Sequence, residues 1–407
     1  MKTGTWLHDD FPVHVILAVL GLSLVGIIAL ISIGLSQPGA WYQHSYVKQI
    51  LFLLIAVSLA YLVYRLPVSR IHKYAYTFYG LGLVGVTMPY FFHRVAGTHR
   101  WISLGGIQVQ PSELAKVFLV IALARFLSDH KPENLKFREI ILSMILVAIP
   151  VGIVANQPDL GTALILFAPL FPMLFWAGAR PYHLFLFIAP LLSILTAFHT
   201  LSFSLWGILL LGIIYLSRPT LLAGVTVYFS NLFLGLLSPY FWGLLKPYQQ
   251  ERILTFLNPE KDPLGSAYQI IQSQTAIGSG GLFGKGFGQG TQTHLKFLPV
   301  QESDFILSVI GEELGFIVIA AVLITFAWLL IRILRTSYEC RDRFVSLMAM
   351  GFSIIFLAHV FVNAAMTVGM IPVKGLPLPF ISYGGSFLVT SYIMLGLILK
   401  SELKQLD

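Results

Sequence analysis

The sequence predicts an all-α, polytopic membrane protein that forms a single integral membrane domain over residues 1–407. Hydrophobic residues make up 57% of the chain and charged residues only 11%, whereas soluble domains carry about 25% charged residues. Apolar stretches of roughly 17 to 25 residues recur along the whole chain, and each is long enough to cross a bilayer as a helix. No stretch remains for a separate soluble domain.

About twelve membrane-spanning helices are predicted from the apolar stretches and the polar, Gly or Pro breaks between them. The first stretch is too long for the core of a signal peptide, so we expect it to be retained. An alternative interpretation makes one pair between 182 and 245 re-entrant or interfacial, because the breaks there are short, and it leaves ten spans. The twelve helices are expected near 12–35, 46–65, 72–92, 112–128, 139–155, 160–178, 182–199, 202–217, 221–245, 304–331, 344–371 and 380–400.

The distribution of Lys and Arg predicts the orientation, because cytoplasmic loops carry an excess of positive residues. With the N-terminus inside, 16 of the 26 Lys and Arg residues fall on the inner side. Half of the others belong to one long loop, 246–303, whose charges count little. Both termini are therefore predicted to be cytoplasmic. Four polar segments, 93–113, 156–161, 246–303 and 371–386, are predicted to form one exoplasmic site.

The residue pattern excludes several classes of function. Cys340 is the only cysteine, so the chain has no intramolecular disulfide framework and no Cys-based metal cluster. The positive residues are scattered and form no basic block of the kind that binds nucleic acid. In the glycine-rich run 278–290, Lys285 is followed by Gly rather than Ser or Thr, so the run does not match a nucleotide-binding loop. We interpret it as flexible backbone.

Asp304 is the strongest candidate for a catalytic residue. It lies at the first turn of a long apolar helix, at the predicted membrane edge, where an ionisable side chain indicates a functional site. Glu302, two residues away, is expected to raise the pKa of one of the two carboxyls, which suits proton abstraction near neutral pH. The alternative is that Asp304 only stabilises the start of the helix, with Ser303 as its N-cap.

Two further acids, Glu312 and Glu313, follow in the same stretch. In a straight helix they lie about 12 to 14 Å deeper in the membrane than Asp304, by the rise per residue. Adjacent acids at that depth are too costly to face lipid. We therefore expect them to face protein or a wet cavity, for example by capping other helices, and both a structural and a functional role remain open.

Other polar residues near the predicted helix ends admit two interpretations each. Glu113 and Lys116 are three residues apart and share a helix face, so they form either a buried ion pair or a substrate contact. Asp159 follows a proline at a helix start and is either an N-cap or a functional acid. Gly384 and Gly385 allow close approach of the backbone to a ligand.

Four positive residues, predicted on the outer side with these acids, would suit a pyrophosphate group. They are Arg100, Arg252, Lys285 and Lys374.

Six ordered motifs carry a resemblance to a known family. In their order, and over nearly the whole chain, they resemble the SEDS family of bacterial cell-wall proteins, and DPLGSAYQIIQS and GLPLP are most similar to its elongation branch. The family usually has His-Thr before the acid that matches Asp304, where this chain has Glu302 and Ser303. The six motifs are QPSELAK, QPDLGT, NPEKDPLGSAYQIIQS, AIGSGGLFGKGFGQGTQ, ESDFI with GEELG after it, and PLPFISYGGS.

The resemblance implies a processive peptidoglycan glycosyltransferase that polymerises lipid II outside the bacterial cytoplasmic membrane. It also implies a class B penicillin-binding protein and the elongation machinery as partners, and a ten-helix core in which 201–240 is an inserted helix pair. Asp304 matches the family's essential catalytic acid. The residues predicted to bind substrate are Arg100, Trp101, Glu113, Lys116, Gln157, Asp159, Arg252, Lys285, Lys374, Ser382, Gly384 and Gly385.

The implied reaction needs one base. Asp304 takes the proton of the 4-hydroxyl of an acceptor GlcNAc, which attacks C1 of the donor MurNAc and releases undecaprenyl pyrophosphate. An α donor bond and a β-1,4 product indicate a single displacement with inversion. The charge of the leaving group is met by Arg100, Lys116 or Lys374, or by a divalent cation such as Mg²⁺ or Mn²⁺. We predict no metal-ligating residue and no certain cofactor.

Two rival functions fit a polytopic chain with intramembrane acids. A lipid II flippase or another transporter is expected to show internal repeats and a site near the membrane midplane, whereas here the polar segments are predicted at one face and no repeat is found. A scaffold that only activates its penicillin-binding partner does not require the acid at Asp304.

Overall fold

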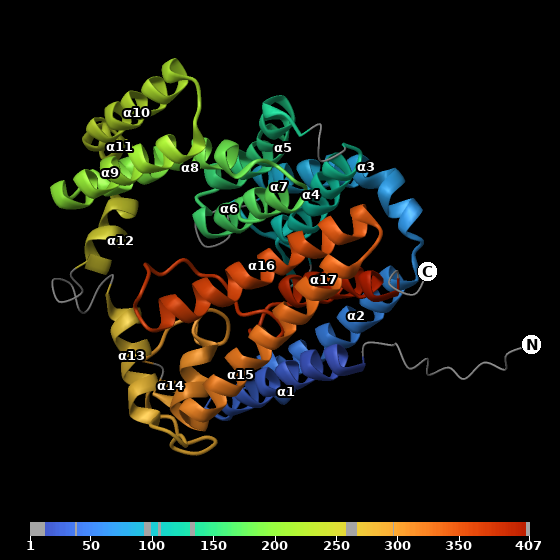
Figure 1. The fold of residues 1–407 in the computed structure, drawn as a ribbon. Coiled ribbons are helices and arrows are strands. Elements are labelled where there is room, and N and C mark those ends of the chain that lie inside the picture. The colour runs from blue at the N-terminus through green and yellow to red at the C-terminus, as the bar shows by residue number, and fades with distance from the viewer. Residues whose placement is uncertain are drawn as a thin grey trace, which may run out of the picture.

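The computed structural model describes residues 13–36, 39–92, 99–104, 107–130, 135–257, 267–295 and 297–403. Nearly all regular structure in these residues is helical (Figure 1). The chain ends and residues 258–266 of the predicted long loop lie outside the described residues.

The helices follow the predicted apolar stretches along the chain. The first part contains α1 (Val13–Leu35), η1 (Trp41–Gln43), α2 (Ser45–Arg65), α3 (Val68–Thr87), η2 (Met88–Phe91), α4 (Pro111–Ser128), α5 (Phe137–Asn156), α6 (Leu160–Phe167), α7 (Leu170–Trp176) and α8 (Pro181–Thr196). The rest contains α9 (Thr200–Ser217), α10 (Leu221–Leu236), α11 (Ser238–Gly243), α12 (Pro247–Leu257), α13 (Tyr268–Gly280), α14 (Thr291–His294), α15 (Ile306–Glu339), α16 (Arg343–Thr367) and α17 (Gly385–Leu403). A small antiparallel hairpin, β1 (Ile102–Leu104) and β2 (Ile107–Val109), precedes α4.

Within the described residues, six helices are long and apolar enough to cross a membrane, namely α1, α2, α5, α9, α15 and α16. Shorter apolar segments lie at 160–176, 181–196, 221–236 and 385–401. The chain is therefore a multi-pass membrane protein, and the count of twelve spans stays a prediction.

Two of the predicted helices are broken by proline. The predicted helix 160–178 is divided into α6 and α7 at Pro169, and the helix 221–245 is divided into α10 and α11 beside Pro239. Proline has no N–H to donate to the preceding turn, so the helix ends there. The sequence pattern gave the right stretches but not these interruptions.

The glycine-rich run 278–290 is packed, so its interpretation as flexible backbone is wrong. The main-chain N–H groups of Lys285 and Gly286 donate to the carbonyl oxygens of Glu312 and Glu313, at 2.9 and 3.0 Å. The run thus lies directly on the first turns of α15, and α13 packs on the same helix.

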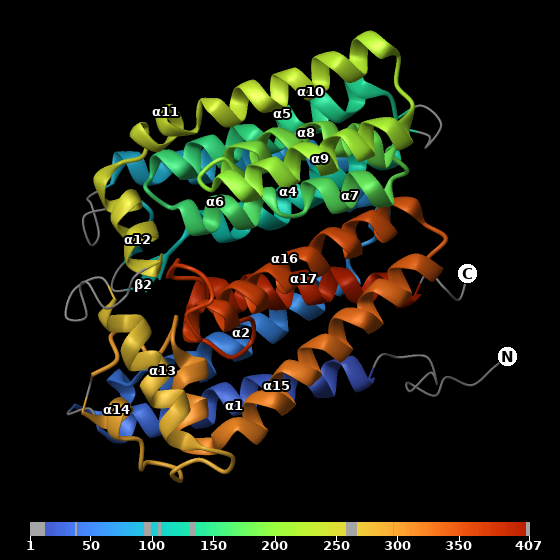
Figure 2. The same ribbon diagram turned by 60° about the vertical axis from the view of Figure 1, so that its left-hand side comes forward.

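The predicted inserted pair, α9 and α10, lies on the outer side of α8 (Figure 2). Its apolar contacts form a small cluster around Trp206 and Leu210, separate from the main core of the other helices. A buried polar contact joins the pair to α8, since Ser193 donates to Asn231 Oδ1 at 3.0 Å and accepts from Trp206 Nε1 at 2.8 Å. The pair thus packs beside the main core, and its status as an insertion stays a prediction.

Helices α12, α13 and α14 and the β hairpin gather at one end of the bundle (Figure 2). The connection between α16 and α17 reaches the same region, because Arg252 of α12 donates to the carbonyl of Val373. The described parts of the four polar segments predicted to form one site are therefore close together, as the contacts below show. Which side of the membrane this end faces stays a prediction.

Candidate active site

Asp304 lies just before α15 and does not cap it. The N-cap position is Phe305, and no side chain makes a capping hydrogen bond there. Ser303 Oγ instead donates to Asp304 Oδ1, at 3.0 Å. The interpretation of Asp304 as a helix-starting acid with Ser303 as N-cap is therefore wrong, and its second carboxylate oxygen accepts no hydrogen bond from any described residue.

The main chain around Asp304 is held at three consecutive carbonyl oxygens, which we call the three-carbonyl contact. Each of these carbonyls accepts one hydrogen bond, and the three donors come from α16 and from the loop between α16 and α17. Tyr383 N–H donates to Glu302 (2.9 Å), Ser382 Oγ to Ser303 (2.5 Å) and Asn363 Nδ2 to Asp304 (2.9 Å).

Gly375 makes room for the free side of the carboxylate. This glycine has a φ of +63°, a conformation that disfavours other residues. A Cβ at this position would lie 3.1 Å from Asp304 Oδ2, so a side chain here would crowd the carboxylate. The loop that carries Lys374 and Gly375 thus passes directly beside Asp304.

Burial raises the pKa of the Asp304 carboxyl to about 6, and the hydrogen bond from Ser303 opposes part of this rise. The second acid was expected to raise the pKa of one of the two carboxyls, but at Asp304 the cause of the rise is burial and not Glu302. The Glu302 carboxylate accepts a hydrogen bond of 2.5 Å from Ser45 of the segment that starts α2. A carboxylate with a pKa near 6 is ionised at neutral pH and still basic enough to accept a proton.

Glu113 and Lys116 form a buried ion pair, with Nζ 2.7 Å from Glu113 Oε2, and both side chains are almost fully enclosed. Lys116 Nζ also lies 3.1 Å from Nε2 of His359 on α16. His359 Nδ1 is 3.1 Å from the carbonyl of Pro377 and must donate there, so Nε2 accepts from the lysine. The pair therefore connects α4 to α16 and to the loop beside Asp304. A direct contact of either residue with substrate stays a prediction.

Asp159 is the N-cap of α6, as one of its two interpretations predicted. It accepts hydrogen bonds from Thr162 N and Oγ1, at 3.1 and 2.9 Å, and from Gln110 Nε2 at 3.1 Å. Arg100 Nη1 lies 3.9 Å from Asp159, and Arg100 Nε donates to the carbonyl of Gln157.

Two further predicted residues lie beside this cluster. Gln157 is buried and donates to Val86, and Trp101, next to Arg100, is partly exposed. Their roles in substrate binding stay predictions.

Arg252 and Lys374 place two positive charges over the loop beside Asp304. Arg252 is exposed, and Lys374 is partly buried. Burial lowers the pKa of Lys374, and the nearby charge of Arg252 lowers it further. Neither cation forms an ion pair with a carboxylate of the described residues. The Lys374 carbonyl also lies against Gly161 of α6, so this loop joins the Asp159 cluster to Asp304.

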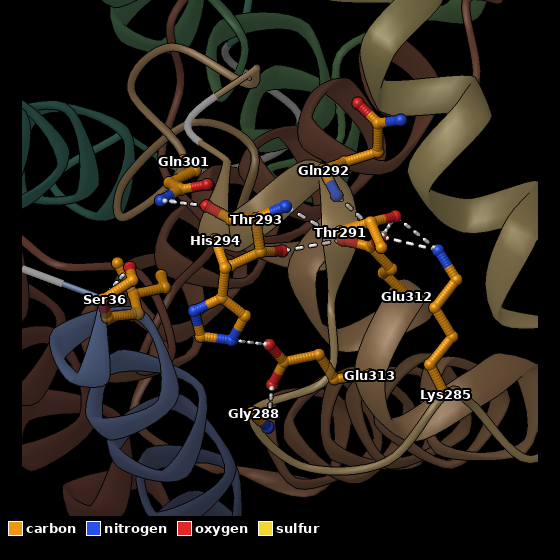
Figure 3. A network of polar contacts seen from close by, with 11 residues as sticks. Ser36, Lys285, Gly288, Thr291, Gln292, Thr293, His294, Gln301, Glu312 and Glu313 are labelled. Carbon is orange, nitrogen blue, oxygen red and sulfur yellow. Dashed lines mark hydrogen bonds and ion pairs between the residues drawn. The ribbon is translucent and has the colours of Figure 1, made fainter.

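Lys285, Glu312 and Glu313 belong to a separate polar network (Figure 3). Glu312 accepts hydrogen bonds from the N–H groups of Gln292 and Thr293, at 2.9 and 3.0 Å, and thereby caps α14. Lys285 Nζ bonds Glu312 Oε1 at 2.8 Å. The expectation that these acids face protein is confirmed: Glu312 caps another helix, and Glu313 lies 3.2 Å from His294 Nε2. The positive charge of Lys285 is held by Glu312.

The predicted helix 304–331 is not continuous. Gly315, with a φ of +83° and a ψ of 176°, breaks α15 directly after Glu312 and Glu313. The acids therefore belong to a short first helical segment that packs on the glycine-rich run.

Three predicted binding residues in the SYGGS turn make protein contacts. The Ser382 hydroxyl donates to Ser303 and accepts from Leu378 N–H at 2.8 Å, and it is buried. Gly384 N–H donates to Gln49 Oε1 at 3.3 Å, and Gly385 lies against the ring of Phe52. These contacts position the turn on α2, and contact with a ligand stays a prediction.

Sequence reasoning missed Asn363 and His359, which hold the loop and the main chain at Asp304. Both are fully buried polar residues in the otherwise apolar α16. They are four residues apart and so share a helix face. Buried polar residues in a membrane-spanning helix indicate a functional site, so this signal was available. Among the described residues, no three His, Cys, Asp or Glu side chains gather as a metal site.

Comparisons with known proteins show the family of this chain. Residues 12–405 match the FtsW/RodA/SpoVE family, described as cell cycle proteins. The chain belongs to this family. The match confirms the family predicted from the six sequence motifs.

The relatives of this FtsW/RodA/SpoVE protein include proteins named RodA and proteins named FtsW. It is 32% identical to the peptidoglycan glycosyltransferase RodA of Treponema pallidum, over 98% of this chain and 99% of the relative. It is also 32% identical to the probable peptidoglycan glycosyltransferase FtsW of Trichlorobacter lovleyi, over 96% and 92%. A chain from a solved peptidoglycan synthase complex that coordinates polymerization and crosslinking superposes with a TM-score of 0.71. That chain is 27% identical, and the match covers 97% of this chain and 98% of that one.

Proposed function

We propose that this chain is a peptidoglycan glycosyltransferase that polymerises lipid II into β-1,4-linked glycan strands during cell elongation. The observation that carries the proposal is the position of Asp304. Its carboxylate is partly buried, does not cap the helix and keeps one oxygen without a hydrogen bond from the described residues. It lies beside the loop that carries Lys374 and contacts Arg252 of α12. The family and the names of its relatives support this activity.

In the proposed reaction Asp304 is the general base. Its Oδ2 accepts the proton of the acceptor GlcNAc 4-hydroxyl as that oxygen attacks C1 of the donor MurNAc. The C1–O bond to undecaprenyl pyrophosphate breaks, and its electron pair leaves with the pyrophosphate. The α bond of the donor becomes a β bond in one displacement, so one base is sufficient.

Arg252 and Lys374 are the proposed partners of the leaving pyrophosphate. Lys374 lies on the loop beside Asp304, Arg252 of α12 contacts this loop at Val373, and the pKa of Lys374 is lowered by burial and by Arg252. Two like charges held together without a described acidic partner are favourable only when an anion is near. Arg100 bonds the carbonyl of Gln157 and lies near Asp159, so we assign it a supporting role in shaping the site.

The proposed location is the bacterial inner membrane, with both termini cytoplasmic and the site exoplasmic. The excess of Lys and Arg on the predicted inner side supports this orientation. The proposed partner is a class B penicillin-binding protein that crosslinks the strands. It is supported by the resemblance to a chain from a complex that couples polymerization with crosslinking.

The reaction rate is expected to fall on the acidic side as Asp304 is protonated. Because the pKa of Asp304 is about 6, the carboxylate form should predominate at pH 7, and the rate at pH 5 should be about one tenth of the plateau. Initial rates of polymerisation between pH 5 and 8 measure this. A flat profile across this range would contradict the assignment of the base.

The function itself is tested with the purified full-length protein and fluorescent lipid II, alone and with the class B penicillin-binding protein of the same organism. Long glycan strands resolved on a gel are expected. A parallel assay in liposomes measures movement of lipid II across the bilayer. Transbilayer movement without strands would reject the transferase and support the transporter.

A further inference from the structure

The face of α16 toward the site carries two fully buried polar side chains, His359 and Asn363. They are one helical turn apart, so both project to the same side. Their hydrogen-bond partners outside α16 include the carbonyls of Pro377, Leu376 and Asp304. A rigid membrane helix thus contacts both the loop beside the site and the segment that carries Asp304.

Asn363 joins these two segments directly. Its Nδ2 donates to the carbonyl of Asp304 at 2.9 Å and to the carbonyl of Leu376 at 2.7 Å. Both partners are acceptors, so the NH₂ group must face them and the amide orientation is fixed. Neither a carboxylate nor an apolar side chain of the same size can replace these two bonds.

The amide oxygen of Asn363 is left without a partner by this arrangement. Oδ1 is buried and has no hydrogen-bond partner in the described part of the chain. Buried polar atoms are nearly always paired, and an exception requires an explanation. Here the explanation is that the position needs two donors, which only the amide NH₂ group supplies at this size.

We propose that Asn363 is a positioning residue for the transferase reaction, which holds the main chain of Asp304 at a fixed place relative to the loop that carries Lys374 and Gly375. The inference rests on the proposed role of Asp304 as base. Asn363 fixes where the base lies between the acceptor hydroxyl and the cations. Proton transfer and attack require the reacting groups within a fraction of an ångström, and a displacement of about 1 Å costs about 100-fold in rate.

The test compares Asn363→Leu with Asn231→Leu in the full-length protein. Asn231 is also a buried Asn in an apolar helix, but it bonds Ser193 and Val227 in the added pair α9–α10. Asn363→Leu is expected to lower kcat for fluorescent lipid II by about 10- to 100-fold with little change in KM. Asn231→Leu is expected to retain kcat per folded molecule.

The fall in rate on the acidic side of the pH profile, which we call the acid limb, distinguishes a positioning role of Asn363 from a loss of folded protein. If the main chain is released, water should reach Asp304, lower its pKa and move the acidic fall in rate to lower pH. Partial unfolding should lower the plateau rate without changing the pH at which the rate falls. The charged or titratable groups on the segments around Asp304 are Glu302, Arg252, Lys374, Tyr383 and His359. All five remain in the variant, so a shift reports the surroundings of Asp304.

The outcomes are distinguishable. If wild type makes no strands, the proposed function fails. If Asp304→Asn remains active, the base assignment fails. If Asp304→Asn is inactive but Asn363→Leu keeps the wild-type kcat and pH profile, the positioning role is rejected. If Asn363→Leu does not fold, Ser382→Ala tests the same main-chain support, because this change removes the hydrogen bond to the neighbouring Ser303 carbonyl. It should lower kcat and shift the limb in the same direction.

Discussion

Replacing Asp304 with asparagine is expected to reduce lipid II polymerisation by about 10²- to 10⁴-fold, the contribution of a general base. Asparagine keeps the size of the side chain and can still accept the bond from Ser303. It cannot take the proton of the acceptor hydroxyl. The measurement is the initial rate of strand formation by the purified variant in lipid vesicles.

The stability of this variant should not fall. Burial raises the folded-state pKa of Asp304 above that of an exposed carboxyl, so ionisation at neutral pH opposes folding, and this cost appears as pH rises through about 4 to 6. The neutral amide avoids the cost, so its melting temperature at pH 7 should equal or exceed that of wild type.

The matched control is Glu302→Gln, the same acid-to-amide change two residues away, which should retain activity within about tenfold because Ser45 can still bond the amide oxygen. If Asp304→Asn is as active as Glu302→Gln, Asp304 is not the general base.

Lys116→Met is expected to destabilise the protein by about 3 to 5 kcal/mol, the usual cost of removing one partner of a buried ion pair. Glu113 is almost fully enclosed, so its charge would be left without the cation in an apolar environment. His359 would lose the donor to Nε2. Thermal unfolding of the detergent-solubilised protein, followed by size-exclusion fluorescence, should show a clearly lower midpoint.

The double variant Glu113→Leu with Lys116→Met is the control for this interpretation. Replacing a whole buried ion pair with apolar residues is often neutral, so the double variant should regain at least about 2 kcal/mol over the single one. A single variant that melts like wild type would show that the pair is not structural. A direct role of Lys116 with substrate would then be the better account.

The sequence predicted the helical stretches well, because the bilayer requires long apolar segments and helices satisfy their own backbone. It also singled out Asp304, since an acid next to an apolar helix is rare. The break at Gly315 and the bonds of Glu312 to α14 were not predictable. They depend on which distant segment packs on α15, and periodicity within one stretch carries no information on that.

Residues that act through the main chain were the hardest to find. Asn363 and Ser382 bond carbonyl oxygens, and a carbonyl is present at every position, so no pairing of side-chain types reveals the contact. Lys285 illustrates a related limit of single residues. Its charge suggested an anion site, and its pairing with Glu312, 27 residues further along the chain, was not foreseen, so its contact with substrate stays a prediction.

The three-carbonyl contact bears on how this family tolerates sequence change. Its hydrogen bonds reach the backbone at 302, 303 and 304 and ignore the side chains at the first two positions. Residues 302 and 303 can therefore diverge between lineages without moving the acid that follows them. A chain with Glu-Ser here, in place of the His-Thr that the resemblance implies, can therefore keep the same main-chain support for Asp304. What the side chain at 303 still sets is the direct bond to the carboxylate, so the backbone contact governs the place of the acid and residue 303 its basicity.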